Sequence, residues 1–434
     1  MVNNNLSAAS IGNTLRSALL SEMIREEDTS AILYDLSFLE SRIRYLTACF
    51  PKNTLHGLAI KANPLLRILE FEKGIAPNIG AEAASIGEVT MALRAGYRPD
   101  QIVYDSPVKT MHELEFALKT GLHINVDNLS ELNRVALIYQ ARSGFSTLTG
   151  SVGLRINPQI GLGTILESSV AGEYSKFGVP IKYQRAQLEQ AFLTHAWLTG
   201  VHLHVGSQGC PMEMLVDGIG GLYDFTIEVN EKRRNANLPP IDVFDIGGGL
   251  PVAYDNISTI PSMEEYVGKI TRRAPQLFNT KAFKLITEFG RWTCTNAGWT
   301  VSRVEYVKHD QSINTAMLHV GADLFLRECL NPKDWHHQYT LFDREGRIKE
   351  GKDVNPWNLA GPLCFSGDML AKEIWLPPVE EGDYLVIHDS GGYTFSMWSR
   401  YNSRQTPRII GYREDRFEIL KERETLEELQ RFWE

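Results

Sequence analysis

Strand-like and helix-like segments alternate from about residue 36 to about residue 290, and this alternation is the strongest constraint on the fold. Amphipathic stretches such as Ser85–Arg94, Met111–Lys119 and Ser130–Tyr139 lie between short apolar runs. Alternating strands and helices form parallel sheets. Seven or eight such units that close on themselves give a (β/α)8 barrel, whose functional residues gather at the carboxyl ends of the strands. The predicted strands are Leu55–Ile60, Ile102–Tyr104, His123–Val126, Ser151–Ile156, Gly200–His204, Val243–Ile246 and Lys284–Thr287.

The chain changes character after about residue 290, where strand-like segments follow one another without helices between them. The predicted strands there are Trp299–Tyr306, Thr315–Val320, Asp383–His388 and Gly392–Ser396. A short apolar run near the start, Ala31–Tyr34, can pair into the same β unit, and the charged Thr425–Glu434 predicts a surface helix. We therefore expect two domains. The α/β barrel would cover residues 36–289, and a C-terminal β-sandwich or β-barrel domain would combine residues 1–35 and 290–434.

Composition narrows the classes of protein to which this chain can belong. It has 434 residues, of which 43% are hydrophobic and 22% charged, as in an ordinary soluble globular protein. A net charge of -9 without a basic stripe argues against a nucleic-acid partner. No apolar run reaches the roughly 18 residues of a membrane span, and residues 1–30 lack the apolar core of a signal peptide. The five cysteines form no C-x-x-C pair, so we expect a cytoplasmic protein with neither a zinc site nor a disulfide framework.

Lys61 follows directly on a buried apolar run, in the sequence HGLAIKANP over residues 56–64. Burial of an unpaired ammonium is unfavourable, so a lysine at the end of a buried strand shifts its pKa or changes its chemistry. As a neutral amine it can form a Schiff base with an aldehyde. Taken alone, the residue is also compatible with a lysine that extends its ammonium into water. The other motifs decide between these two interpretations.

Two motifs that follow predicted strands suit a flat, phosphorylated ligand. The glycine triplet Gly247-Gly248-Gly249 lets backbone N–H groups approach a phosphate, because no Cβ stands in the way. The stretch HLHVGSQ, residues 202–208, contains His204, which can stack on a flat ring, and Ser207, which can bind phosphate. Each motif alone is also compatible with a tight turn or with a core histidine.

Three further motifs carry groups for acid–base chemistry and phosphate binding. Glu288, at the end of a strand, can keep a pyridine nitrogen protonated, and Arg291 follows it closely. Cys364 lies four residues before Asp368, and a cysteine beside a charged cofactor can act as an acid. Tyr393 follows two glycines, where its hydroxyl can reach a phosphate. Each motif alone also has a simpler interpretation. Glu288 can form an ion pair at a strand end, Cys364 can be an inert thiol, and Tyr393 can be an aromatic residue on a strand.

In this order and spacing, the motifs resemble those of the fold-type III pyridoxal-phosphate decarboxylases, which include diaminopimelate, ornithine and arginine decarboxylases. The resemblance extends from about Ala31 to about Arg408, and the spacings are most similar to the diaminopimelate branch. It implies an alanine-racemase-like (β/α)8 barrel, an amino-acid substrate and pyridoxal 5'-phosphate (PLP) as cofactor. The motifs that carry it are Lys61-Ala-Asn, Arg155-Ile-Asn-Pro, Ser175-Lys-Phe-Gly178, His204-Val-Gly-Ser-Gln, the glycine triplet, Glu288-x-Gly-Arg, Cys364-x-x-x-Asp and Gly-Tyr393.

The resemblance implies a role for each of these residues. Lys61 would hold the cofactor as a Schiff base, and the ring would take up the charge left when the substrate loses its carboxylate. Glu288 would keep the ring nitrogen protonated, and His204 would stack on the ring face. Arg155 and Glu88 match positions near the ring and Lys61. The phosphate would be held by Ser207, Gly248, Gly249, Arg291 and Tyr393.

The resemblance also implies an obligate homodimer with shared active sites, because Cys364 and Asp368 match residues that reach the site from the partner subunit. Cys364 would be the acid that reprotonates Cα, and Asp368 would lie near the substrate side chain. The substrate side departs from diaminopimelate decarboxylases, which carry a glutamate where this chain has Phe365. They also have a tyrosine shortly after the arginine that matches Arg327, whereas this chain has Asn331.

The expected reaction is therefore decarboxylation of an amino acid in an altered pocket formed by Arg327, Phe365, Asp368 and Tyr393. The alternative substrates are diaminopimelate, a conjugated or modified amino acid of secondary metabolism, and ornithine, lysine or arginine. The last three are less favoured, because their enzymes need no arginine at the Arg327 position. An amino-acid racemase is disfavoured by Glu288, where racemases have arginine. An inactive regulatory homologue is disfavoured because the chain keeps Lys61, His204, Glu288, Arg291 and Cys364.

Overall fold

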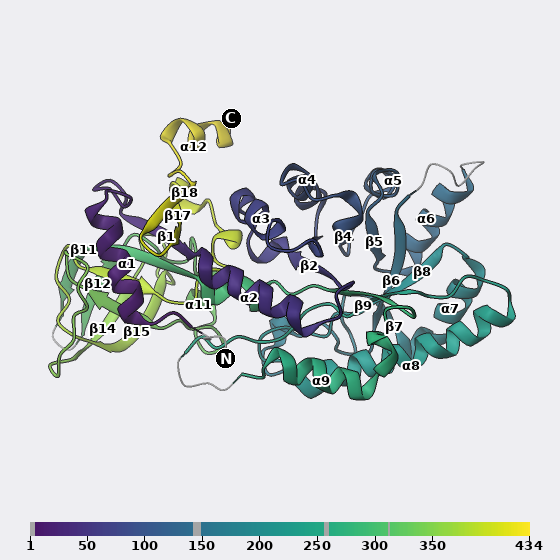
Figure 1. Ribbon diagram of the computed structural model, residues 1–434. Coiled ribbons are helices and arrows are strands. Elements are labelled where there is room, and N and C mark those ends of the chain that lie inside the picture. Colours follow the sequence, from purple (N-terminus) through teal and green to yellow (C-terminus); the bar gives the residue numbers. More distant parts are fainter. Residues whose placement is uncertain (1–4, 142–148, 256–259, 311–312) are drawn as a thin grey trace. The chain divides into compact units, whose positions relative to one another are not determined.

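The computed structural model describes residues 5–141, 149–255, 260–310 and 313–434. They form two compact units, each assembled from separate stretches of the chain (Figure 1). The barrel unit comprises Arg42–Pro251 and Ile260–Trp292. The β unit comprises Met1–Ser41, Val252–Thr259 and Thr293–Glu434.

Eight parallel strands form the wall of the barrel unit within the described residues. They pair in the order β5-β4-β3-β2-β10-β9-β8-β6, and pairing of β5 with β6 closes the ring. The prediction of a (β/α)8 barrel is confirmed. The strands are β2 (Leu55–Ala59), β3 (Ile79–Ala83), β4 (Ile102–Asp105), β5 (His123–Val126), β6 (Ser151–Asn157), β8 (Leu198–His202), β9 (Val243–Asp245) and β10 (Lys284–Thr287), with the two-residue β7 (Val179–Pro180) attached to β6.

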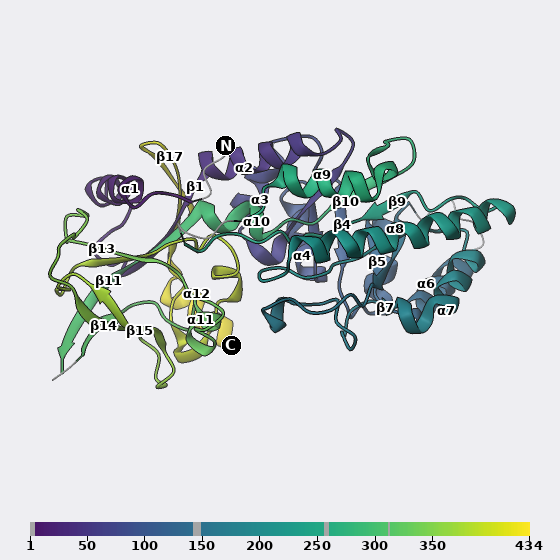
Figure 2. The ribbon, with the colours of Figure 1, turned by 90° about the horizontal axis from the view of Figure 1, so that it is seen from below.

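Helices connect these strands and cover the outside of the barrel. Within the barrel unit, α3 to α6 lie on one side of the strands, and α8 and α9 lie on the opposite side (Figures 1 and 2). None of the described helices is both long and apolar enough to cross a membrane. The helices are α2 (Leu36–Cys49), α3 (Leu66–Lys73), α4 (Ile86–Arg94), α5 (Met111–Thr120), α6 (Leu129–Gln140), α7 (Ile181–Thr194), α8 (Met212–Asn235), α9 (Met263–Arg273) and α10 (Arg291–Cys294).

Strand β3 was not among the predicted strands. Its sequence, IGAEA, contains one β-branched residue and otherwise small or charged residues, so its intrinsic strand preference is low. All five residues are buried. A Cβ on Gly80 would lie 2.3 Å from the carbonyl oxygen of Gln101, so a larger residue would not fit there. Packing within the barrel therefore determines this strand, which carries Glu82 into the functional region.

The β unit contains a nine-stranded sheet, counted over the described residues. Strand β1 (Ser30–Asp35) lies within it, antiparallel to β11 and parallel to β17, which confirms that Ala31–Tyr34 joins the C-terminal strands. Helix α1 (Ala8–Leu20) packs Ile11 and Leu15 onto the sheet core beside Trp299. The remaining strands are β11 (Gly298–His309), β12 (Asn314–Leu318), β13 (Tyr339–Phe342), β14 (Asn355–Ala360), β15 (Met369–Leu376), β16 (Tyr384–Ile387), β17 (Arg408–Arg413) and β18 (Arg416–Lys421).

The β unit differs from its prediction in several places, since helix α1 and strands β13, β14, β15, β17 and β18 were not predicted. The expected strand Gly392–Ser396 is wrong, because this segment is a turn that leads into a short 3-10 helix, Phe395–Met397. Tyr393 there adopts a φ of 57°, which is incompatible with an extended strand. The unit also contains a short helix that was not expected, α11 (Leu326–Leu330). The predicted C-terminal helix is present as α12 (Leu426–Trp433).

Candidate active site

Lys61 lies just beyond the carboxyl end of β2, in a single 3-10 turn over Ile60–Ala62. This turn is held tightly against the end of β10. A Cβ on Gly290 would lie 2.8 Å from the Ala59 Cβ and 2.9 Å from the Ala62 Cβ, so glycine is needed for this close approach. The Lys61 side chain is 41% exposed. The backbone of Lys61 is therefore fixed, while its amine remains reachable.

Glu82 on β3 is paired with Lys61, because its Oε2 accepts a hydrogen bond from the Lys61 ammonium. The Glu82 side chain is fully buried, and burial raises its pKa to about 8 although contact with Lys61 lowers it. A carboxyl group with a pKa near neutrality can exchange a proton with a neighbouring amine. Sequence reasoning missed Glu82 because β3 was not predicted. A single carboxylate between alanines in a buried segment was the available signal.

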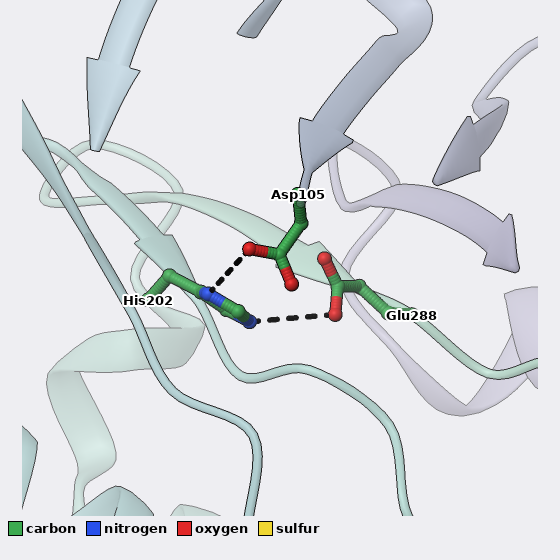
Figure 3. A group of neighbouring side chains, drawn as sticks. All are labelled: Asp105, His202 and Glu288. Atoms are coloured by element: carbon green, nitrogen blue, oxygen red, sulfur yellow. Dashed lines mark ion pairs between the residues drawn. The ribbon is translucent and has the colours of Figure 1, made fainter. Parts of the chain in front are cut away.

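Asp105, His202 and Glu288 form a buried group of ionisable side chains at the carboxyl ends of their strands (Figure 3). Asp105 ends β4, His202 ends β8, and Glu288 directly follows β10. The two ring nitrogens of His202 face different carboxylates. Nδ1 lies 3.7 Å from Asp105 Oδ1, and Nε2 lies 3.4 Å from Glu288 Oε2. Of these three, Glu288 alone was among the predicted site residues.

Arg155 on β6 extends this group to a fourth strand. Its Nη1 donates a hydrogen bond of 3.0 Å to Asp105 Oδ2, and its guanidinium lies 4.5 Å from the centre of the Phe177 ring. Gly178 follows Phe177 with a φ of 70°, in the left-handed region that favours glycine. Burial raises the pKa of Asp105, but Arg155 and His202 lower it below its ordinary value. Asp105 is therefore an anion held between two cationic partners.

The glycine triplet forms a tight turn against the loop that carries His204. The Gly248 N–H donates a hydrogen bond of 3.2 Å to His204 Nδ1, so that nitrogen carries no proton. Burial lowers the pKa of His204 to about 3, so its ring is neutral at physiological pH. A Cβ on Gly248 would lie 2.4 Å from the Glu288 carbonyl oxygen, and Gly249 has a φ of 116°. This turn therefore requires glycine at both positions.

Arg291 and Ser207 place a cation beside a hydroxyl group. Arg291 begins α10 directly after Gly290, and its Nε donates a hydrogen bond of 3.0 Å to Ser207 Oγ. Arg291 is largely buried. A guanidinium group with a neighbouring hydroxyl provides directed donors for an oxyanion such as phosphate.

Glu88 lies in the first turn of α4, where it stabilises the start of the helix. Its Oε2 accepts a hydrogen bond of 2.6 Å from the Ala84 N–H. Burial raises the pKa of Glu88, while this hydrogen bond and the charge of Lys61 lower it. Glu88 thus lies within electrostatic reach of Lys61.

In the β unit, Arg327 and Tyr393 lie together. Nη2 of Arg327 donates a hydrogen bond of 2.9 Å to the Tyr393 carbonyl oxygen. The guanidinium carbon lies 4.1 Å from the centre of the Trp335 ring and 5.4 Å from that of Tyr393. These residues and Met397 line a small pocket of about 10 Å³, room for about one water molecule. The predicted substrate arginine therefore belongs to an aromatic pocket.

The Cys364 loop contains three of the predicted residues in different environments. Cys364 and Phe365 are exposed, and the Phe365 ring packs edge-on against Tyr401 at 6.1 Å. Asp368 is buried, and its two oxygens accept hydrogen bonds from the backbone N–H groups of Ala322 at 2.6 Å and Leu363 at 2.5 Å. Contact of Asp368 with a substrate stays a prediction. The geometry favours instead a role in shaping the loop.

Comparison with known families decides what this arrangement is. Residues 36–295 match the family model described as "Pyridoxal-dependent decarboxylase, pyridoxal binding domain". The chain belongs to this family. Diaminopimelate decarboxylase of Helicobacter pylori is 30% identical over 421 residues, which cover 95% of this chain and 97% of that protein. Diaminopimelate decarboxylase of Methanothermobacter thermautotrophicus is 32% identical over 383 residues, which cover 86% and 83% respectively.

Solved structures give the same assignment. Helicobacter pylori diaminopimelate decarboxylase complexed with L-lysine matches with a TM-score of 0.82 at 27% identity, over 96% of this chain and 99% of that chain. Vibrio vulnificus lysine/ornithine decarboxylase complexed with cadaverine matches with a TM-score of 0.75 at 23% identity, over 94% of this chain and 99% of that chain. At this identity the match shows the shared fold alone. The protein is a PLP-dependent amino-acid decarboxylase, and the predicted family, fold class, enzyme class and cofactor are confirmed.

The residues of the barrel unit fit pyridoxal phosphate. Glu288 Oε1 is buried and has no hydrogen-bond partner within the described part of the chain, which suits a carboxylate that receives a proton donor from a ligand. The turn at Gly248 and Gly249 has no space for a Cβ, as in a backbone cradle for phosphate. Arg291 and Ser207 add a guanidinium and a hydroxyl group. These features match the ring nitrogen and the phosphate of the cofactor.

Proposed function

We propose that Lys61 forms the covalent link to the aldehyde of pyridoxal phosphate. The observation that carries this proposal is the pairing of the Lys61 amine with the buried Glu82 at the carboxyl end of β2. In its ionised form Glu82, whose pKa is raised to about 8, is a stronger base than an ordinary carboxylate and can take up the proton that the amine must lose before it attacks an aldehyde. When bound, the cofactor supplies an electron-withdrawing ring that takes up the charge left at Cα after loss of the carboxylate.

The remaining proposed roles follow from charge and position. Glu288, an anion, would hold the ring nitrogen of the cofactor in its protonated form, and the neutral His204 ring would provide a stacking surface. Arg155 and Glu88 would lie near the ring and Lys61. Cys364 would supply the proton for Cα. The proposed phosphate ligands are Ser207, Gly248, Gly249, Arg291 and Tyr393.

The proposed substrate is an α-amino acid that carries a second carboxylate at its far end. The curated relatives are named diaminopimelate decarboxylases, and diaminopimelate has such a carboxylate. Arg327 supports the proposal, because a guanidinium binds carboxylates with two parallel hydrogen bonds. Phe365 can meet a distal ammonium through cation–π contact alone. A conjugated or modified amino acid without the distal amine is therefore the second candidate, whereas ornithine, lysine and arginine offer Arg327 no anionic partner.

Carbon dioxide release by the purified, cofactor-loaded protein tests this function. We expect release from meso-diaminopimelate or from an N-acylated diamino acid with a terminal carboxylate, and much slower release from lysine, ornithine and arginine. The Lys61→Ala protein serves as the blank. Failure of the wild-type protein to bind the cofactor would contradict the whole proposal. Cofactor binding with release from the three basic amino acids alone would contradict the proposed substrate class.

The proposed assembly is a cytoplasmic homodimer in which Cys364 acts in the partner's site. All five cysteines are free, which suits a reducing compartment, and the exposed Cys364 is available to a second subunit. Mixing inactive Lys61→Ala and Cys364→Ala proteins tests the sharing. Random re-association makes half the dimers mixed, each with one intact site, so about one quarter of the wild-type activity should return. Sites made within one subunit would give no recovery on mixing.

A further inference from the structure

His202 is a fully buried histidine whose two ring nitrogens face two different carboxylates. Asp105 approaches Nδ1 from β4, and Glu288 approaches Nε2 from the end of β10 (Figure 3). A histidine that binds a metal ion directs one ring nitrogen at the ion while the other bonds elsewhere. Here the ring bridges two anions, so the group is an ion-pair chain rather than a converging set of ligands.

We propose that His202 is a positioning residue, a buried imidazolium that holds Glu288 as an oriented carboxylate toward the cofactor ring and connects it to Asp105 and Arg155. The inference rests on the proposed role of Glu288. The two carboxylates lie at ion-pair distance from the two ring nitrogens, and a cationic ring with a proton on each nitrogen attracts both of them, whereas a neutral imidazole has one donor. The 3.0 Å hydrogen bond from Arg155 to Asp105 fixes the far end of the chain.

The charges around His202 support the cationic form. Burial lowers the pKa of His202, but the carboxylates of Asp105, Glu288 and Asp245 raise it to about 9. Burial likewise raises the pKa of Glu288, but His202, Lys61 and His204 hold it far below its ordinary value. His202 and Glu288 therefore stabilise each other's charged form.

Two other ionisable groups lie in this part of the barrel, Asp245 and His123. Asp245 on β9 has a strongly raised pKa because of burial and the charge of Glu288, and Asn125 and the Gly247 N–H bond its oxygens. His123 on β5 has a pKa lowered to about 4, chiefly by burial. The His123 ring is thus neutral near pH 7. The charged groups are the cations Arg155, His202 and Lys61 and the carboxylates Asp105 and Glu288, while burial raises the pKa of Glu82 to about 8.

Loss of the His202 cation would change the protonation of Glu288 in a defined direction. An opposite charge within about 4–6 Å lowers a carboxyl pKa by roughly 1–3 units, so its removal raises that pKa by a similar amount. Glu288 would then take up a proton at a higher pH. A protonated carboxyl group no longer favours the protonated ring nitrogen, so the acid limb of the kcat profile should move to higher pH.

The test compares wild-type, His202→Gln and His56→Gln holoenzymes. His56 is the matched control, because it is also a fully buried barrel histidine, bonds Thr287 Oγ1 at 2.9 Å, and has a pKa lowered to about 3 by burial alone. In His202→Gln we expect the acid limb of the kcat profile to move to higher pH by about 1–3 units, while KM stays nearly unchanged. The cofactor absorption spectrum should change at the same pH. The His56→Gln profile should keep the wild-type acid limb.

A measurement on the wild-type protein covers the case in which His202→Gln does not fold. Neutron diffraction of the wild-type holoenzyme near neutral pH should show deuterium on both ring nitrogens of His202. Deuterium on one nitrogen alone would overturn the inference. So would a kcat profile of His202→Gln whose acid limb lies at the same pH as in the wild type. An inactive wild-type enzyme would instead overturn the proposed function, so the two failures are distinguishable.

Discussion

Replacement of Lys61 by alanine is expected to abolish the absorption band of the covalently bound cofactor and to reduce turnover by roughly 10³-fold or more, as loss of a covalent catalytic group does in other enzymes. Alanine has no amine that could attack the cofactor aldehyde. It also leaves Glu82 buried without its cationic partner, so the neutral form of that carboxyl group becomes more favourable. Absorption spectroscopy and carbon dioxide release measure the two effects separately.

Lys119→Ala is the matched control for this prediction. Lys119 on α5 is 48% exposed, against 41% for Lys61, and it pairs with Glu115 at 3.1 Å on the helix surface. Exposed pairs of this kind contribute about 0.2–1 kcal/mol, so the control should keep both its absorption band and its activity. A Lys61→Ala protein that kept the lysine-linked band would refute the assignment of Lys61, and equal losses in both variants would indicate a general loss of folding.

The strands of the barrel were predictable to the extent that their own residues favour extended backbone. His123–Val126 agrees with β5 residue for residue, and Lys284–Thr287 agrees with β10. Strand β8 runs from Leu198 to His202 rather than from Gly200 to His204, because the chain turns there to meet the glycine triplet. Strand β3 could not be predicted from propensity, since contacts with neighbouring strands allow its small residues to be extended.

The candidate site was predictable where a motif carries its own signal. Lys61, the glycine triplet and His204 each stand in a recognisable stretch at a strand end. Glu82 and Asp105 do not, because the partners that make a buried carboxylate tolerable come from other strands and are distant in sequence. A periodic pattern identifies which side chains point inward, but it does not identify which of them will meet.

His202 and His204 illustrate the same limit. They stand two residues apart, with His202 fully buried and His204 half-buried. Desolvation lowers the pKa of His204 to about 3, while carboxylates raise that of His202 to about 9. The difference comes from Asp105 and Glu288, which belong to other strands. One stretch of sequence thus provides a neutral ring for stacking and a cation for charge balance, and their roles follow from the fold alone.

Replacement of Gly248 by alanine is expected to weaken cofactor binding and reduce turnover by about 10²-fold, because small displacements of a catalytic group have effects of that size. The new Cβ would lie 2.4 Å from the Glu288 carbonyl oxygen, so the backbone at Gly248 or at Glu288 must move. Either movement disturbs the 3.2 Å hydrogen bond from Gly248 to His204 or the position of Glu288. Overpacking of this kind also lowers the free energy of unfolding by about 1–3 kcal/mol.

Gly221→Ala separates this steric effect from the general effect of adding a methyl group. Gly221 is exposed in the middle of α8, and a Cβ there would meet nothing within 4 Å. Because alanine restricts the unfolded chain and favours helix, this variant should be more stable by about 0.5–1 kcal/mol, with unchanged turnover. Urea denaturation and carbon dioxide release on both variants provide the measurements. A Gly248→Ala enzyme with normal cofactor affinity would show that the turn yields without moving Glu288, and the proposed phosphate cradle would then be wrong.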